Sequence, residues 1–180
     1  PFGKVKYSKK NVYYVRIHGF QKLNSADIVI DYSNPNIYNV KTSTLFNDFS
    51  NKHIYIAPYI YKNIDTTPEN RDIKMLTTFI NVNEPRRKQL LCNIKTGGLE
   101  HTNINNCFDK IELQELYRNT KILINIHQTD HHDTFEELRV LPALQNGVLV
   151  VSEKSPLNHL IPYNNLIIWS DYDNIIDTVK

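Results

Sequence analysis

The sequence predicts an α/β fold with a Rossmann-like, doubly wound and mostly parallel sheet. Short runs rich in Ile, Val and Tyr alternate along the chain with segments that carry apolar residues at helical spacing. The clearest case is residues 121–153, where a strand, a polar loop, a helix, Gly147 as a left-handed cap and a second strand follow one another. Two apolar strands joined by a crossover helix form a parallel βαβ unit. Ligands of such units bind where strands end and helices begin.

The other elements continue this alternation. Strands are predicted at residues 11–17, 26–32, 53–61, 73–80, 121–127, 148–152 and 165–170. Helices are predicted at residues 42–51, 85–95, 112–118 and 135–146, with a short turn or helix at 155–161 and another helix in the C-terminal tail. Residues 62–72 are polar, contain Pro68 and have no periodicity, so they are the best candidate for a linker or hinge.

Composition limits the class of protein. The chain has 180 residues, 41% of them hydrophobic and 22% charged, which is typical of a globular domain. A net charge of +2 is too small to indicate a nucleic-acid-binding surface. The chain has neither a signal-peptide pattern nor an apolar run near the ~18 residues of a membrane span. Cys92 and Cys107 form no CxxC pattern, so we expect free thiols in a reducing compartment. Because the chain begins with Pro1 rather than Met, we expect a piece of a longer protein.

Two adjacent arginines follow Pro85 at a predicted helix N-terminus. Proline favours the first helical position, whereas cations there oppose the helix dipole. A bound anion would offset that cost, since backbone N–H groups and both guanidinium groups would point at it. Arg86 and Arg87 are therefore candidates for phosphate binding. The alternative is an ordinary solvated helix face.

A second candidate group opens the helix at 135–146. Thr134 followed by Glu137 fits a capping box, which would give Glu137 a structural role. Glu136 is not needed for that cap, so it could accept hydrogen bonds from sugar or ribose hydroxyls. Arg139, one turn on, could pair with Glu136 or reach a phosphate. A purely structural role for Glu136 is equally compatible with this local pattern.

His127 ends a predicted buried strand, where it could contact a ligand phosphate or act in acid–base chemistry. The loop beyond it holds imidazoles and carboxylates, which are ligands for zinc or manganese. These residues are Asp130, His131, His132 and Asp133. Their spacing is not HExxH, and adjacent histidines rarely converge on one ion, so we expect no metal site.

Ser152 and Glu153 end the last strand of the βαβ unit and are predicted at the same rim. They could take part in binding a ligand there. Alternatively, Ser152 could cap the turn that follows.

Three separated motifs resemble the donor-binding half of glycosyltransferases with the two-lobed GT-B architecture, in particular bacterial and viral members. The first motif runs from Asn83 to Arg87, and the second is Asn125-Ile126-His127. The third, from Glu136 to Glu153, reads E-x-x-R-x-x-x-A-L-x-x-G-x-x-V-V-S-E. The resemblance covers roughly residues 73–170. Residues 11–61 resemble, more weakly, the last strands of the acceptor lobe.

The resemblance implies a division into residues 1–61 as the end of the acceptor lobe, 62–72 as the linker and 73–180 as the donor-binding lobe. It implies an enzyme that transfers a sugar from a nucleotide-diphosphate-sugar to an acceptor hydroxyl on a glycan or glycoconjugate. No cofactor or metal is implied, because side-chain cations and helix N-termini neutralise the leaving diphosphate. The implied partner is the remaining lobe of the parent protein. The implied location is the cytoplasm, that of the host if the gene is viral.

The resemblance also implies roles for individual residues. His127 and Glu136 would be catalytic, and the donor and its phosphates would be bound by Arg86, Arg87, Arg139, Ser152 and Glu153. The sequence departs from the best-known retaining pattern, which has two glutamates separated by seven residues. Thr134 and Pro142 stand in their places, so neither retention nor inversion is predicted.

Two other functions remain open from the sequence. One is a non-catalytic nucleotide- or phosphate-binding module on the same fold, which would bind without turnover. The other is a metal-dependent hydrolase that uses the residues from His127 to Asp133. Fold alone does not choose among them, because this type of sheet supports many functions.

Overall fold

The computed structural model describes residues 2–6, 12–16, 20–42, 50–58, 70–129 and 135–180. Its centre is a five-stranded sheet in the order β6-β5-β7-β8-β9, with every neighbouring pair parallel. The strands are β5 (Ile73–Thr77), β6 (Thr102–Asn103), β7 (Thr120–Asn125), β8 (Leu149–Glu153) and β9 (Ile167–Ser170). The predicted α/β class and doubly wound parallel sheet are confirmed.

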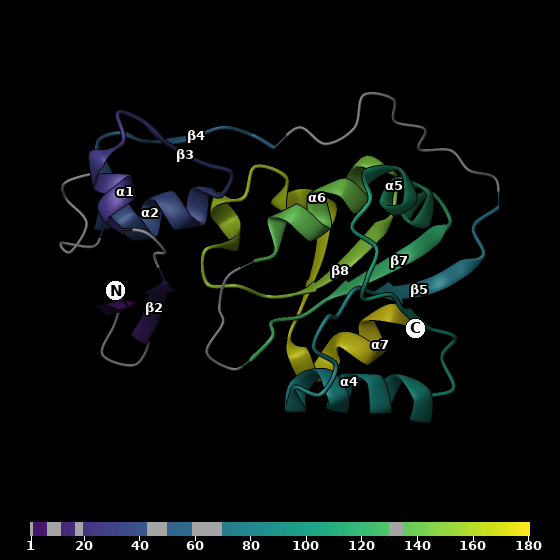
Figure 1. Ribbon diagram of the computed structural model, residues 1–180. Helices are drawn as coiled ribbons and strands as arrows, with labels where there is room; N and C mark the ends of the chain where they lie inside the picture. Colours follow the sequence, from purple (N-terminus) through teal and green to yellow (C-terminus); the bar gives the residue numbers. More distant parts are fainter. Residues whose placement is uncertain (1, 7–11, 17–19, 43–49, 59–69, 130–134) are drawn as a thin grey trace.

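Helices cover both faces of this sheet. Figure 1 shows α5 (Lys110–Arg118) and α6 (Glu137–Gln145) on one face, and α4 (Pro85–Thr96) and α7 (Ile175–Val179) on the other. Successive residues of a strand point to opposite faces, and the core is divided accordingly. Leu76 and Leu123 pack with α5 and α6, whereas their neighbours Met75 and Ile124 pack with α4 and α7. A strand buried on both faces reads as a continuous apolar run, which is why these strands could be predicted.

The helix ends follow the local sequence. Pro85 begins α4, which ends before Gly97 and Gly98, and Gly98 has a φ of 67°. Gly147, with a φ of 68°, closes α6 in the left-handed conformation, as predicted. Asp109 caps α5 by accepting hydrogen bonds from the N–H groups of Ile111 and Glu112. Short 3₁₀ turns follow β8, at Asn158–Leu160, Asn164–Leu166 and Tyr172–Asn174.

The predicted capping box at the start of α6 is wrong. The helix begins at Glu137, so this residue is not in the third helical position. Glu137 is fully buried, and its carboxylate accepts a hydrogen bond of 2.8 Å from the Tyr163 hydroxyl. The side chain therefore turns into the protein instead of back onto its own helix. Thr134 lies outside the described residues.

The N-terminal part holds a hairpin and a second, smaller parallel unit. Strands β1 (Phe2–Lys6) and β2 (Val12–Arg16) are antiparallel. After helix α1 (Phe20–Ser25), strand β3 (Val29–Asp31), helix α2 (Asn34–Thr42) and strand β4 (His53–Tyr55) form a parallel βαβ unit. The strands at 11–17, 26–32 and 53–61 were predicted, but α1, α2 and β6 were not. The helix predicted at 42–51 falls mainly on residues 43–49, outside the described part.

The small unit contacts the large one through residues at the start of α2. The Asn34 side chain donates a hydrogen bond of 3.3 Å to the Leu160 carbonyl, and the neighbouring Ser33 lies close enough to Glu137 to lower the pKa of its carboxyl. All five strands of the large sheet fall within 73–180. Most of the predicted linker, residues 62–69, is not described. Arg71 at its end donates hydrogen bonds to the carbonyls of Tyr117, Thr120 and Asn146.

Candidate ligand-binding site

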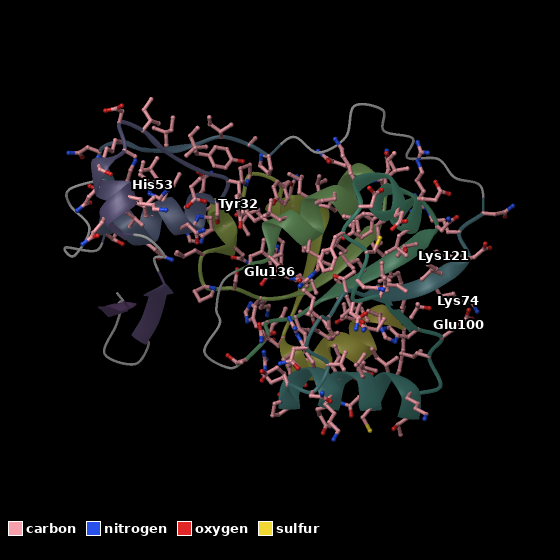
Figure 2. The ribbon with its side chains drawn as sticks, viewed as in Figure 1. Tyr32, His53, Lys74, Glu100, Lys121 and Glu136 are labelled. Atoms are coloured by element: carbon pink, nitrogen blue, oxygen red, sulfur yellow. The ribbon has the colours of Figure 1, made fainter. Side chains whose placement is uncertain are left out.

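The candidate site lies at the carboxyl edge of the large sheet. Numbered along the chain, the five strands have the order 2-1-3-4-5, so the direction of winding reverses between β5 and β7. Ligands of doubly wound sheets bind outside the carboxyl ends of the strands at this reversal. Figure 2 shows Glu136 on the side of the sheet that faces the N-terminal unit, away from Lys74 and Lys121 at the amino ends. The predicted site residues that are described lie on this edge or on α4 and α6 beside it.

Arg86 and Glu153 form an ion pair across the site. Arg86 donates two hydrogen bonds to the Glu153 carboxylate, of 3.1 and 2.5 Å, with both side chains less than 15% exposed. The guanidinium group also lies 4.3 Å from the ring centroid of Tyr172, whose hydroxyl donates to the Arg86 carbonyl. Glu153 further accepts a hydrogen bond of 3.0 Å from the backbone N–H of His127, and the His127 Nδ1 lies 3.5 Å away. Glu153 thus holds the end of β7 and the start of α4 together.

Arg87 has a different environment from that of its neighbour. It is only 4% exposed and makes no hydrogen bond or salt bridge with any described residue; its buried Nε has no partner there. The guanidinium group lies 4.7 Å from the ring centroid of Phe79. Burial, followed by the positive charge of Arg139, lowers the pKa of Arg87. The negative charges of nearby Glu136 and Glu84 raise the pKa of Arg87 and so partly oppose this shift. Buried charges in proteins are normally paired with an opposite charge. Because no described residue forms a salt bridge with Arg87, its guanidinium group could bind an anionic group of a ligand.

Arg139 belongs to a buried polar chain across β7 and β8. Its guanidinium group donates a hydrogen bond of 2.9 Å to the Asn125 side chain, which donates one of 2.9 Å to the Ser152 hydroxyl. Ser152 donates to the Glu153 carbonyl. Asn125 and Ser152 are fully buried, so these hydrogen bonds fix the position of the Arg139 guanidinium group at the end of β7. Ser152 therefore has a positioning contact, and its predicted capping of the following turn is not seen.

The adjacent residues Glu136 and Glu137 differ in burial, since the first is exposed to solvent and the second lies inside the protein. Glu136 is exposed at the N-terminus of α6, and its charge acts on Arg87 and on Tyr32 of the small unit. Glu137 is buried, and burial raises its pKa, although nearby Ser33 and the hydrogen bond from Tyr163 partly oppose the shift. Of these two carboxylates, Glu136 is therefore the one that faces solvent.

A polar cluster at the ends of β5 and β6 was missed by the sequence reasoning. The Thr77 hydroxyl donates to the Asn103 side-chain oxygen at 2.7 Å and lies 2.8 Å from the His101 Nε2. Because a hydroxyl has one proton, Nε2 of His101 must carry the hydrogen in this contact. The Asn103 amide also bonds both the N–H and the carbonyl of Phe79, which positions the ring against Arg87. No sequence pattern links these residues, because β6 has only two residues.

The described residues also bear on the predictions about metal binding, cysteines and membrane spans. Within the described ranges, no group of three His, Cys, Asp or Glu side chains is placed to hold a metal ion. Residues 130–134, which contain most of the His/Asp cluster, are not described, so the hydrolase hypothesis is not tested. Cys92 and Cys107 are free thiols, as predicted. Among the helices described, none is long and apolar enough to cross a membrane.

Comparison with known proteins finds relatives in a giant virus. Two uncharacterized proteins of Acanthamoeba polyphaga mimivirus are similar to this chain. One is 33% identical over 152 residues, which are 82% of this chain and 50% of that protein. The other is 31% identical over 163 residues, which are 83% of this chain and 49% of that protein. The chain thus spans about half the length of the curated relatives it matches. No protein-family model and no solved structure matches the chain.

Proposed function

We propose that this chain is the donor-binding part of a glycosyltransferase. It would bind a nucleotide-diphosphate-sugar at the carboxyl edge of the large sheet and transfer the sugar to an acceptor hydroxyl on a glycan or glycoconjugate. The observation that carries the proposal is the buried Arg87 guanidinium group, whose Nε has no hydrogen-bond partner and which forms no salt bridge among the described residues. It lies on the first turn of α4, at the strand edge where doubly wound sheets bind ligands.

The proposed diphosphate would lie between the start of α4 and Arg139. The side chain of the N-cap residue, Glu84, makes no capping hydrogen bond to α4, and the positive end of the helix dipole would favour a phosphate there. Arg87 and Arg139 are close enough for the charge of one to lower the pKa of the other. An anion between them would relieve this repulsion. It would also stabilise the negative charge that develops on the leaving diphosphate during transfer.

Glu136 and His127 would then face the sugar end of the donor. An exposed carboxylate can accept hydrogen bonds from sugar hydroxyls, and Glu136 is an exposed acid at this rim. His127 is 5% exposed, and Glu153 accepts a hydrogen bond from its backbone. We therefore assign His127 to binding the donor sugar or to transferring a proton to or from a group in direct contact with it. The primary phosphate contact goes to Arg87, because Arg86 is already bound to Glu153.

The second candidate function is a module that binds the same ligand without catalysis. It is favoured by the engagement of His127 and Arg86 with Glu153, which gives both residues a structural role. It is also compatible with a chain that spans half the length of its relatives, since an acceptor site or a base could lie in the other half. The two functions share the phosphate site and differ only in turnover.

The first test is the melting temperature of the chain with UDP, GDP, TDP or CDP, and with inorganic phosphate as the control. A ligand at about one hundred times its dissociation constant adds ~2.7 kcal/mol, an upward shift of about 5–11 °C for a chain of this size. We expect a shift with one nucleoside diphosphate and a smaller one with phosphate. Absence of any shift in a cooperatively folded sample would contradict the proposed donor site.

The second test separates the enzyme from the binding module. The nucleotide identified above is offered as its sugar conjugates, and release of nucleoside diphosphate is measured with the wild-type chain and with Glu136→Gln. The enzyme proposal predicts release that the substitution reduces at least tenfold, with nucleotide binding retained. Tight binding with no release from any conjugate, by this chain or its full-length form, would favour the non-catalytic module.

A further inference from the structure

In the small parallel unit, the two-stranded sheet of β3 and β4 is covered by α2 on one face and is exposed on the other. Successive residues of its strands alternate between the faces. On the first face, Val29 and His53 are buried, together with Ile37 and Val40 of α2. On the second face, four isoleucines are exposed. They are Ile28 (60% exposed), Ile30 (63%), Ile54 (42%) and Ile56 (49%).

These four side chains form one continuous surface, which we call the isoleucine face. Ile30 and Ile54 are direct cross-strand partners in the parallel register, and Ile28 and Ile56 lie two residues from them on the same side. Isoleucines scattered singly on a surface need no explanation, but an adjoining set on one sheet face indicates an interaction site. Parallel strands are found almost only with both faces covered. Two strands with a single covered face therefore lack half of their usual packing.

We infer that the isoleucine face is the docking surface for an amphipathic helix supplied by the same polypeptide from outside residues 1–180. Crossover helices of a doubly wound sheet cover both of its faces, and α2 already covers one of them here. The curated relatives extend over about twice the matched length, so proteins of this kind have further polypeptide to supply such a helix. The fitting helix carries Leu, Ile, Val or Phe at positions i, i+3/i+4 and i+7.

A second copy of the chain fits this face less well. A stable interface buries about 800 Å² on each partner, and four partly exposed isoleucines provide much less. A helix of the same polypeptide avoids the cost of association, so a small apolar surface is sufficient to hold it. The inference does not depend on the proposed glycosyltransferase activity, because the isoleucine face is separate from the arginines at the edge of the large sheet.

The test is site-specific photo-crosslinking in the full-length polypeptide that the gene encodes. A benzophenone amino acid replaces Ile30, and in a control protein it replaces Ile111, which is 78% exposed on α5. After irradiation and proteolysis, crosslinked peptides are identified by mass spectrometry. We expect an intramolecular crosslink from position 30 to a helical segment outside residues 1–180, and none to that segment from position 111. A crosslink within residues 1–180, to a second copy or to another protein would overturn the inference. So would a gene that encodes no further residues, or no crosslink at all.

A paired stability measurement checks the result without crosslinking chemistry. The double variant Ile30→Thr/Ile54→Thr retains β-branched side chains but removes most of the apolar surface. In the 180-residue chain, where this face is bare, we expect the melting temperature to change by less than about 2 °C. In the full-length polypeptide we expect a fall of about 4 °C or more, because the same positions are buried there. Equal changes in both proteins would overturn the inference.

Discussion

Arg86 donates two hydrogen bonds to the Glu153 carboxylate, although the two residues are 67 positions apart in the sequence. The contact joins the first turn of α4 to the end of β8, and Glu153 extends it to the backbone of His127 at the end of β7. Adjacent Arg87 forms no ion pair with a carboxylate in the part of the chain that the structure describes. The two neighbouring arginines therefore differ in their contacts, and the proposed ligand contact is assigned to Arg87.

The first prediction concerns the structural arginine. Arg86→Met leaves the Glu153 carboxylate without its ion-pair partner, so we expect a loss of about 3 kcal/mol in the free energy of unfolding. Urea denaturation measures it, with Lys88→Met as the control because Lys88 is exposed on the same helix. A loss for Arg86→Met no greater than that of the control would show that the ion pair does not hold α4 to β8.

The second prediction is a pH dependence that arises from Glu137. Burial raises the folded-state pKa of this carboxyl above its ordinary value of 4.5. The folded state therefore binds the proton more tightly than the unfolded state. The resulting stabilisation is complete below about pH 4.5 and is lost as the pH rises through the raised folded-state pKa.

Glu137→Gln replaces the titratable carboxyl group with an amide that binds no proton in this pH range. The amide oxygen can still accept the hydrogen bond from the Tyr163 hydroxyl. We expect the variant to gain stability relative to the wild type as the pH rises above about 4.5 through the raised folded-state pKa of Glu137. Urea unfolding at several pH values provides the measurement. Parallel stability curves for the two proteins would contradict the raised pKa.

The third prediction concerns Arg71, which ends the predicted linker. Its guanidinium group donates hydrogen bonds to the carbonyls of Tyr117, Thr120 and Asn146, near the ends of α5 and α6. Arg71→Ala leaves these carbonyls without a cationic donor, so we expect a loss of about 2 kcal/mol in unfolding free energy. The control is Lys121→Ala, an exposed cation at the start of β7. If both variants lose the same small amount, Arg71 does not anchor the linker to the large sheet.

The fourth prediction compares two replacements of Asn125. Asn125→Leu deprives both Arg139 and Ser152 of a buried partner, which should cost about 2 kcal/mol or more. Asn125→Asp keeps an acceptor for Arg139, so the loss of stability should be smaller. Its new negative charge should nevertheless weaken nucleotide binding about tenfold, because it offsets the Arg139 charge. Calorimetric titration of both variants checks this, and unchanged affinity in Asn125→Asp would place the anion away from Arg139.

Strands β5, β7, β8 and β9 of the large sheet could be predicted from sequence because they have apolar residues on both faces. Runs such as KILINI and VLVV leave few alternatives for a buried segment bounded by turn signals. Helix α2 was missed because Asn34-Pro35-Asn36 has the composition of a turn, although proline is tolerated in the first turn of a helix. The start of α6 was misplaced because Glu137 fits a cap in sequence and is buried by tertiary contacts in the structure.

The edge on which the site residues lie was also predictable, but their partners were not. Strand ends and helix starts place Arg86, Arg87 and Glu153 at the carboxyl edge of a parallel sheet. Nothing in the sequence distinguishes Arg86 from Arg87, since the distinction depends on which side of α4 faces Glu153. The pairing of Thr77 with Asn103 depends on a two-residue edge strand, too short for any periodic pattern to reveal.

The most direct test of the proposed phosphate site is the stability of Arg87→Met, measured without ligand and with the nucleoside diphosphate that stabilises the wild type. The substitution removes a buried charge that has no salt-bridge partner among the described residues and keeps an apolar side chain against Phe79. Without ligand, we therefore predict a free energy of unfolding equal to or up to about 1 kcal/mol above that of the wild type. With ligand, we predict that the rise in melting temperature is lost. A destabilised variant that still gains the full wild-type shift would contradict the assignment of Arg87 to the ligand.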